Sequence, residues 1–288
     1  MIRYQEVINK YFELKDTPES TQESYHRRIS IFIKYIEDQQ KVIEEISEND
    51  IQQFILYLKN DRKLQPGTIN NYTSAVKFLC THLLDMDWNS RKIPRMRREE
   101  KLPVVPPKEV ILALIDLISN PKHKAVVSLL YGSGLRVGEA VALKIGDICS
   151  KTMQVRIGKA KHNTVRYSIL AENSLEILRL YFRKNFQPGT YTVDDWLFPG
   201  QKEGEHLSTK SIKNIIIKHR DKLQLDPGVS AHTLRHAFAT HALEEGMDFI
   251  HIKNLLGHKD ISTTAKYLHL TSKSLMGMKS PFDTGRDE

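Results

Sequence analysis

A stretch of ten residues toward the C-terminus combines three histidines with an arginine. Residues 232–241 read HTLRHAFATH and otherwise have the pattern of an amphipathic helix. His232 and His236 stand four residues apart, the spacing of a helical metal site, whereas His232 and Arg235 stand three apart and could grip a phosphate. These three residues share one face of the helix, and we expect the helix to bury the opposite, apolar face.

A metal site is the weaker of these two interpretations. A zinc protease needs a glutamate directly after the first histidine to activate water, but position 233 is threonine. No cysteine or further histidine follows at ligand spacing, and the chain has only two cysteines, Cys80 and Cys149. We therefore expect neither a metal ion nor another cofactor, and the scarcity of cysteine indicates a reducing compartment, the cytoplasm.

A second polar motif lies downstream, in the sequence LLGHKDISTTAKY of residues 255–267. Gly257 is a natural helix terminator, and His258 follows it directly. Ser262 can cap a short helix that holds Tyr267. The motif therefore predicts that a helix ends next to a group of polar side chains.

A third motif lies upstream, in the sequence YGSGLRVGEAVAL of residues 131–143. Arg136 follows two glycines that permit a tight backbone approach, and Glu139 stands one turn later, where it can orient a neighbouring side chain. Each motif alone is a weak signal, because single Arg, His and Tyr residues are usually solvated or part of a core. Their order and spacing along one chain are far more specific.

The order is GLR, a hairpin lysine, H-x-x-R, LGH, and a tyrosine nine residues after that histidine. This order resembles the tyrosine recombinase family of site-specific DNA recombinases and phage integrases, in its minimal two-domain, Xer-like form. The resemblance spans about residues 107–270. It implies six catalytic positions, and the last of them is the nucleophile: Arg136, Lys159, His232, Arg235, His258 and Tyr267.

The resemblance implies a DNA strand transferase that cleaves and rejoins DNA through a 3′-phosphotyrosyl intermediate, without ATP or a cofactor. The implied partners are a double-stranded DNA recombination site and further copies of the chain, because the family exchanges strands with four protomers on two duplexes. Integration, excision, resolution and transposition of DNA all fit. Two other functions remain open, namely topoisomerase-like resealing of the same strand by a type IB enzyme, and DNA-binding regulation without catalysis.

Elementary chemistry supports these roles. A phosphodiester resists attack by an anion, so its non-bridging oxygens must be neutralised, and the planar forks of Arg136 and Arg235 can do this bidentately. A tyrosine has a pKa of about 10, so Tyr267 needs a proton acceptor, for which His232 is the candidate. We expect Glu139 and His236 to support these groups rather than to react.

The leaving 5′-oxygen needs a proton, which an amine on a hairpin tip can deliver as the general acid. Lys159 follows Gly158 as in the family motif and is our candidate, although Lys161 stands two positions on and stays an alternative. His258 is expected to donate a hydrogen bond to the phosphate.

The hydrophobic pattern predicts an α+β fold that is mainly helical and has a small β-sheet. Residues 1–90 are expected to form a four-helix bundle, similar to the family's SAM-like core-binding domain, and residues 107–288 the catalytic domain with a tail from about residue 270. Segments 153–158 and 164–170 alternate apolar and polar residues and predict a β-hairpin.

Residues 91–106 contain several prolines and predict a basic linker, which is either a solvated connector or a strap that lies along a phosphate backbone. The net charge is +8, and residues 110–288 hold 25 Lys and Arg against 18 Asp and Glu, which indicates an anionic partner. No run is long and apolar enough to span a membrane. The candidate DNA-binding residues are Arg91, Lys92, Arg95, Arg97, Arg98 and Lys161.

Overall fold

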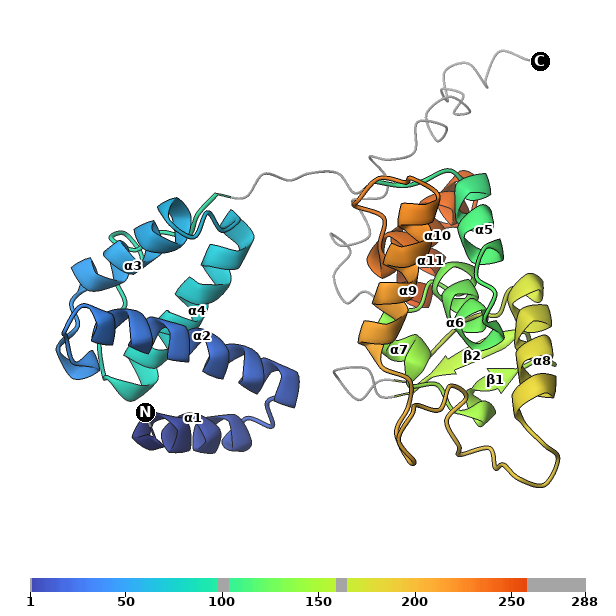
Figure 1. The fold of residues 1–288 in the computed structure, drawn as a ribbon, viewed down its shortest axis with the longest axis horizontal. Coiled ribbons are helices and arrows are strands. Elements are labelled where there is room, and N and C mark those ends of the chain that lie inside the picture. Colours follow the sequence, from blue (N-terminus) through green and yellow to red (C-terminus); the bar gives the residue numbers. More distant parts are fainter. Residues whose placement is uncertain (1, 98–103, 159–164, 258–288) are drawn as a thin grey trace, which may run out of the picture. The chain divides into compact units, whose positions relative to one another are not determined.

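The computed structural model describes residues 2–97, 104–158 and 165–257. The chain divides into two compact units, residues 1–100 and residues 101–288 (Figure 1). Over the described ranges the fold is mainly helical with a small antiparallel sheet, which confirms the predicted fold class. Within those ranges no helix combines the length and apolar character that crossing a bilayer requires.

The first unit is a helical bundle. Phe32, Phe54 and Leu79 are fully buried at its centre. A short 3-10 turn, Ile43–Glu45, joins the second helix to the third. Among residues 2–97 there are four α-helices, as the sequence predicts: α1 (Ile2–Leu14), α2 (Glu19–Asp38), α3 (Glu48–Asn60) and α4 (Pro66–Leu83).

The segment after α4 also belongs to this bundle. Ile93 is 3% exposed and lies in the bundle core. The amide of Asn70 donates to the carbonyl of Met96 over 2.9 Å, and its oxygen accepts from the Met96 N–H over 2.8 Å. The first part of the predicted linker, residues 91–97, is therefore fixed on the first unit, because its apolar residues complete that core.

The second unit surrounds helix α6. Helix α6 packs against α8, α9 and α10, and its residues 125–130 are all buried. Figure 1 shows α6 within this unit. The unit's helices over the described ranges are α5 (Lys108–Asp116), α6 (Pro121–Gly132), α7 (Val137–Val141), α8 (Glu172–Asn185), α9 (Thr209–Lys222), α10 (Ala231–Glu244) and α11 (Phe249–Leu256), with a 3-10 turn at Ile145–Asp147.

The sheet of the second unit has the order β1-β2-β3 with antiparallel pairing. Strands β2 (Gln154–Ile157) and β3 (Arg166–Ile169) are the predicted hairpin strands, and Val155 pairs with Ser168. Strand β1 (Ile148–Cys149) escapes prediction because its two residues are too few to show an alternating pattern.

A glycine turn between α6 and α7 brings the sheet and α10 together. Gly134 has φ +61°, and a Cβ at this position would overlap the ring of Phe238 on α10. The hydroxyl of Ser168 on β3 donates to the carbonyl of Ser133 over 2.7 Å. The turn therefore touches two elements that are distant in sequence, and only glycine allows this approach.

We expect Gly134→Ala to destabilise the second unit by about 2 to 3 kcal/mol, because the change adds backbone strain and a steric overlap with a buried ring. Gly138→Ala is the matched control, since nothing lies within 4 Å of a Cβ placed there. It should stay within about 1 kcal/mol of the wild type. Urea unfolding measures both variants, and equal stabilities would contradict the role given to this turn.

Candidate active site

Arg136 and Glu139 are brought together by the start of helix α7. Arg136 is the residue before the helix, and Glu139 is its third residue. The Arg136 N–H donates to Glu139 Oε2 over 2.8 Å, and Arg136 Nη1 donates to Oε1 over 2.9 Å. This local pairing caps the helix and fixes the direction in which the Arg136 side chain leaves it.

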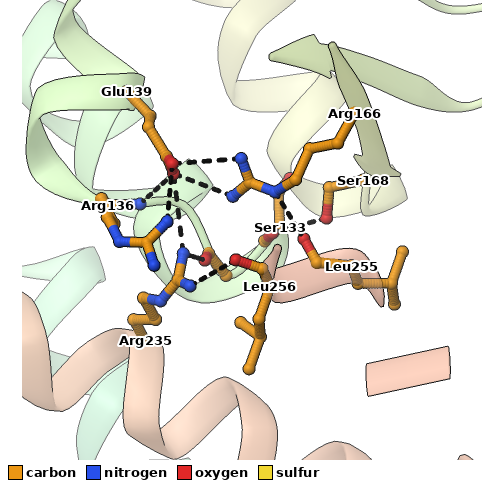
Figure 2. Close-up of polar contacts among 9 residues, drawn as sticks. Ser133, Arg136, Glu139, Arg166, Ser168, Arg235, Leu255 and Leu256 are labelled. Atoms are coloured by element: carbon orange, nitrogen blue, oxygen red, sulfur yellow. Dashed lines mark hydrogen bonds and ion pairs between the residues drawn. The ribbon is translucent and has the colours of Figure 1, made fainter. Parts of the chain in front are cut away.

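Among the described residues, three guanidinium groups surround the Glu139 carboxylate, as Figure 2 shows. Arg166 of β3 forms a two-pronged pair with it, with Nη1 3.0 Å from Oε1 and Nη2 2.9 Å from Oε2. Arg235 of α10 places Nη1 3.5 Å from Oε2. Three positive charges against one negative charge leave an excess of positive charge in this cluster.

The Glu139 side chain is only 9% exposed. Burial by itself raises the pKa of the carboxyl. This effect is outweighed by the hydrogen bonds and the charge of Arg166, by the hydrogen bond from the Arg136 N–H and by the charge of Arg235. The net result is a pKa below the ordinary value, so Glu139 is ionised at neutral pH. It is therefore a permanent counter-ion for the arginines.

Arg235 is almost fully buried, with 3% of its side chain exposed. Its Nη1 donates to the Gly134 carbonyl over 2.8 Å, and its Nη2 donates to the Leu256 carbonyl over 2.5 Å. Ala239, one turn further along α10, is also buried. The apolar face of α10 is buried as expected, with Leu234 and Ala237 fully buried. The Arg235 side is buried as well, because the end of α11 and the glycine turn cover it.

His232 lies at the first turn of α10, which begins after Ser230. Partial burial of its ring, followed by the charges of Arg235, Arg136 and Lys213, lowers the pKa of His232 below its ordinary value of 6.5. The imidazole is therefore neutral at neutral pH and can accept a proton.

His236 packs its ring edge-on against His232, with the ring centroids 5.4 Å apart. Among the described residues, no three or more His, Cys, Asp or Glu side chains come together in a group that could hold a metal ion. His232 and His236 therefore contact each other through their rings and do not belong to such a group.

The end of helix α11 closes the arginine cluster. Gly257 has φ +63° and terminates the helix, as the sequence predicts. The carbonyl of Leu255 accepts from Arg166 Nε over 3.1 Å, next to the Leu256 carbonyl that Arg235 holds. Two arginines from different elements thus cap carbonyls that the helix itself leaves unpaired.

Arg166 is the member of the cluster that the sequence motifs do not indicate. It lies in an alternating segment, and such a strand usually turns its apolar side chains inward. Here the polar Arg166 and Ser168 face inward, whereas Tyr167 is 54% exposed and Ile169 is 37% exposed. A polar residue at every inward position of a short strand is the signal that could have pointed to Arg166.

Four of the predicted DNA-binding residues lie on the segment that packs on the bundle. Arg91, Lys92, Arg95 and Arg97 are all exposed. Lys92 pairs with Glu48, and Arg95 Nη2 donates to the Ser74 hydroxyl over 2.7 Å. The remaining predicted site residues lie outside the described residues: Arg98, Lys159, Lys161, His258 and Tyr267.

Both parts of the chain match known protein families. Residues 107–274 match the model of the phage integrase family, and residues 4–90 match that of the phage integrase N-terminal SAM-like domain. A putative integrase/recombinase of Sinorhizobium fredii, y4qK, is 34% identical over 92% of this chain and 83% of its own length. The tyrosine recombinase XerD of Oceanobacillus iheyensis is 31% identical over 90% of this chain and 91% of its own length.

Solved structures share the fold. The crystal structure of XerA recombinase is 26% identical with a TM-score of 0.55, over 99% of both chains. The pre-cleavage complex of XerH site-specific recombinase with its difH substrate has a TM-score of 0.71 at 19% identity, over 94% of this chain and 83% of that one. With its catalytic part and its N-terminal part both matched, the chain belongs to the phage integrase family, the tyrosine-type site-specific DNA recombinases.

Proposed function

We propose that this recombinase cleaves one strand of a DNA site by attack of the Tyr267 hydroxyl on a backbone phosphorus. The new bond is a 3′-phosphotyrosyl ester, and the bond to the 5′-oxygen breaks. A 5′-hydroxyl of another strand then reverses the step. The observation that carries the proposal is the pair of guanidinium groups, Arg136 and Arg235, held on the single buried carboxylate of Glu139.

This pair suits the charge of the reaction. The phosphodiester carries one negative charge, and attack by a phenolate brings a second one into the transition state, so donors that are fixed in advance stabilise it most. Arg235 is buried and held by two carbonyls, whereas Arg136 is 41% exposed and can meet a phosphate that arrives from solvent. Glu139 fixes the positions of both guanidinium groups, and its single negative charge does not cancel the positive charge of the cluster.

Proton transfer is assigned to His232 and Lys159. The neutral imidazole of His232 takes the phenolic proton, for which its lowered pKa prepares it. Lys159 gives a proton to the leaving 5′-oxygen, with Lys161 as the alternative, and His258 donates a hydrogen bond to the phosphate. These assignments of Lys159, His258 and Tyr267 rest on the family motif, and His236 supports the ring of His232.

The substrate in this proposal is a double-stranded recombination site. The XerH structure is a complex with difH substrate, and the Tn1549 integrase structure is a complex with transposon right-end DNA. For this chain, the exposed Arg91, Lys92, Arg95 and Arg97 contact DNA phosphates, together with Arg98 and Lys161. Four copies act on two duplexes, and residues after about 270 dock on a neighbouring copy.

The nucleophile is tested with Tyr267→Phe. A duplex selected from random-sequence DNA by its binding to the protein is nicked next to the cleavage position, so that the covalent adduct accumulates. We expect the wild type to form an adduct stable to denaturant and Tyr267→Phe to form none, because only the hydroxyl is removed. Band-shift affinity should be unchanged. An adduct formed by the variant would rule out Tyr267.

The same assay separates recombination from topoisomerase-like resealing. A second, differently labelled duplex is added, and the products are sequenced across the joint. Strands joined between the two duplexes support recombination, whereas resealing of the original strand alone contradicts it.

The arginine pair is tested with Arg136→Ala and Arg235→Ala. Each should slow cleavage on the order of 100- to 1000-fold, about 3 to 4 kcal/mol in the barrier, by analogy with the loss of one oxyanion-hole donor. Arg235→Ala should also lower the melting temperature, because it leaves the Gly134 and Leu256 carbonyls unpaired. Single-turnover rates at saturating DNA measure the effect. Cleavage near the wild-type rate in Arg136→Ala would refute its role.

The role of His232 predicts the acid side of the pH–rate profile. The pKa of His232 lies below 6.5, so at pH 6.5 most of the imidazole is still neutral and can accept a proton. The cleavage rate should therefore fall only below pH 6.5. Lys213→Gln removes one of the charges that lower this pKa, so the cleavage rate of this variant should begin to fall at a higher pH than that of the wild type. Lys210→Gln, on the same helix, is the control. Coincident profiles for all three proteins would exclude His232 as the acceptor.

A further inference from the structure

All three guanidinium nitrogens of Arg166 donate hydrogen bonds within the protein. It is 13% exposed, and its Nη1 and Nη2 both donate to the Glu139 carboxylate. Its Nε donates to the Leu255 carbonyl over 3.1 Å. With three donors directed at two partners in the second unit, Arg166 is built to hold groups in place rather than to contact DNA.

The first partner, Glu139, connects Arg166 to both candidate phosphate ligands. Arg166 occupies both oxygens of the carboxylate, while Arg136 Nη1 approaches Oε1 and Arg235 Nη1 approaches Oε2 from other sides. Without Arg166, Arg136 and Arg235 are the cations that the described part of the chain still places on the buried carboxylate. The carboxylate would then draw one of their forks into a closer pair and away from a phosphate.

The second partner, the end of α11, connects Arg166 to the segment that continues toward Tyr267. The Leu255 carbonyl is held by Arg166, and the next carbonyl, of Leu256, is held by Arg235. Gly257 lies directly over the Arg166 side chain, since a Cβ there would be 2.6 Å from Arg166 Cδ. One guanidinium therefore contacts both the counter-ion of the phosphate ligands and the C-terminal end of α11.

We propose that Arg166 is a positioning residue of strand cleavage, acting through Glu139 on the forks of Arg136 and Arg235 and through the Leu255 carbonyl on the end of α11. This inference rests on the function proposed above. It requires that the planar fork of Arg166, and not only its charge, is needed for cleavage. A lysine cannot make two parallel bonds to the carboxylate and a third to the carbonyl.

The test compares Arg166→Gln and Arg166→Lys with Arg156→Gln in the nicked-duplex assay. Arg156 is the matched control, because it lies on the adjacent strand β2 and bonds a buried carboxylate, Asp147, over 2.9 Å outside the cluster. We expect both Arg166 variants to cleave about 100-fold more slowly than wild type at saturating DNA, the loss typical of a misplacement of about 1 Å. DNA affinity should be unchanged, and Arg156→Gln should cleave at the wild-type rate.

A pH profile distinguishes positioning through Glu139 from a general structural effect. Without Arg166, the carboxyl loses the hydrogen bonds and the charge that do most to lower its pKa, so its pKa rises. Glu139 then takes up a proton at a higher pH than in the wild type and releases the two arginines. The rate of Arg166→Gln should therefore fall at a higher pH than that of the wild type. In the double variant Arg166→Gln, Glu139→Gln this added pH dependence should disappear, because no carboxyl remains to titrate.

The outcomes separate the two proposals. A wild type that forms no adduct with the selected duplex refutes the proposed function. A wild type that cleaves, with Arg166 variants as fast as Arg156→Gln or with no change in the pH profile, overturns only the role of Arg166. If Arg166→Gln does not fold, Arg166→Lys carries the rate comparison. If neither folds while Arg156→Gln does, Arg166 is a stability residue and the inference is also overturned.

Discussion

One buried carboxylate organises the catalytic unit. Glu139 is ionised although it is 9% exposed, and it stays so because guanidinium groups from α10 and β3 and the start of its own helix converge on it. Buried charges are tolerated only when they are paired and hydrogen-bonded, so each of these elements is held in place by the others. The same arrangement leaves more positive than negative charge, which is what a phosphate site requires.

Elements that are distant in the sequence position the groups around Glu139. The glycine turn after α6 brings Gly134 against α10, and its carbonyl is a partner of Arg235. The left-handed residue Gly257 ends α11 where two carbonyls meet the arginines. Strand β3 turns its polar residues inward and leaves Tyr167 largely exposed. Each of these features is locally unfavourable or unusual, and the shared ion cluster explains all of them.

Periodic patterns and short motifs predict most of the helices, the two hairpin strands and the joint position of Arg136 and Arg235. They succeed because amphipathic helices and a glycine terminator have local signatures. Arg166 escapes them because its partners, Glu139 and Leu255, are distant in sequence and its strand inverts the usual alternation. The burial of Arg235 escapes as well, since a helical wheel does not show which elements cover a face.

The packing of residues 91–97 on the first unit has a thermodynamic consequence for the proposed DNA complex. A free basic strap would have to be ordered on the duplex, at about 1 to 2 kcal/mol of lost backbone entropy per residue. Here Ile93 and the Asn70–Met96 bonds have already ordered the backbone that carries Arg91, Lys92 and Arg95. In the proposed complex, phosphate contacts from these residues would not carry this backbone-ordering cost, because folding has already immobilised the segment.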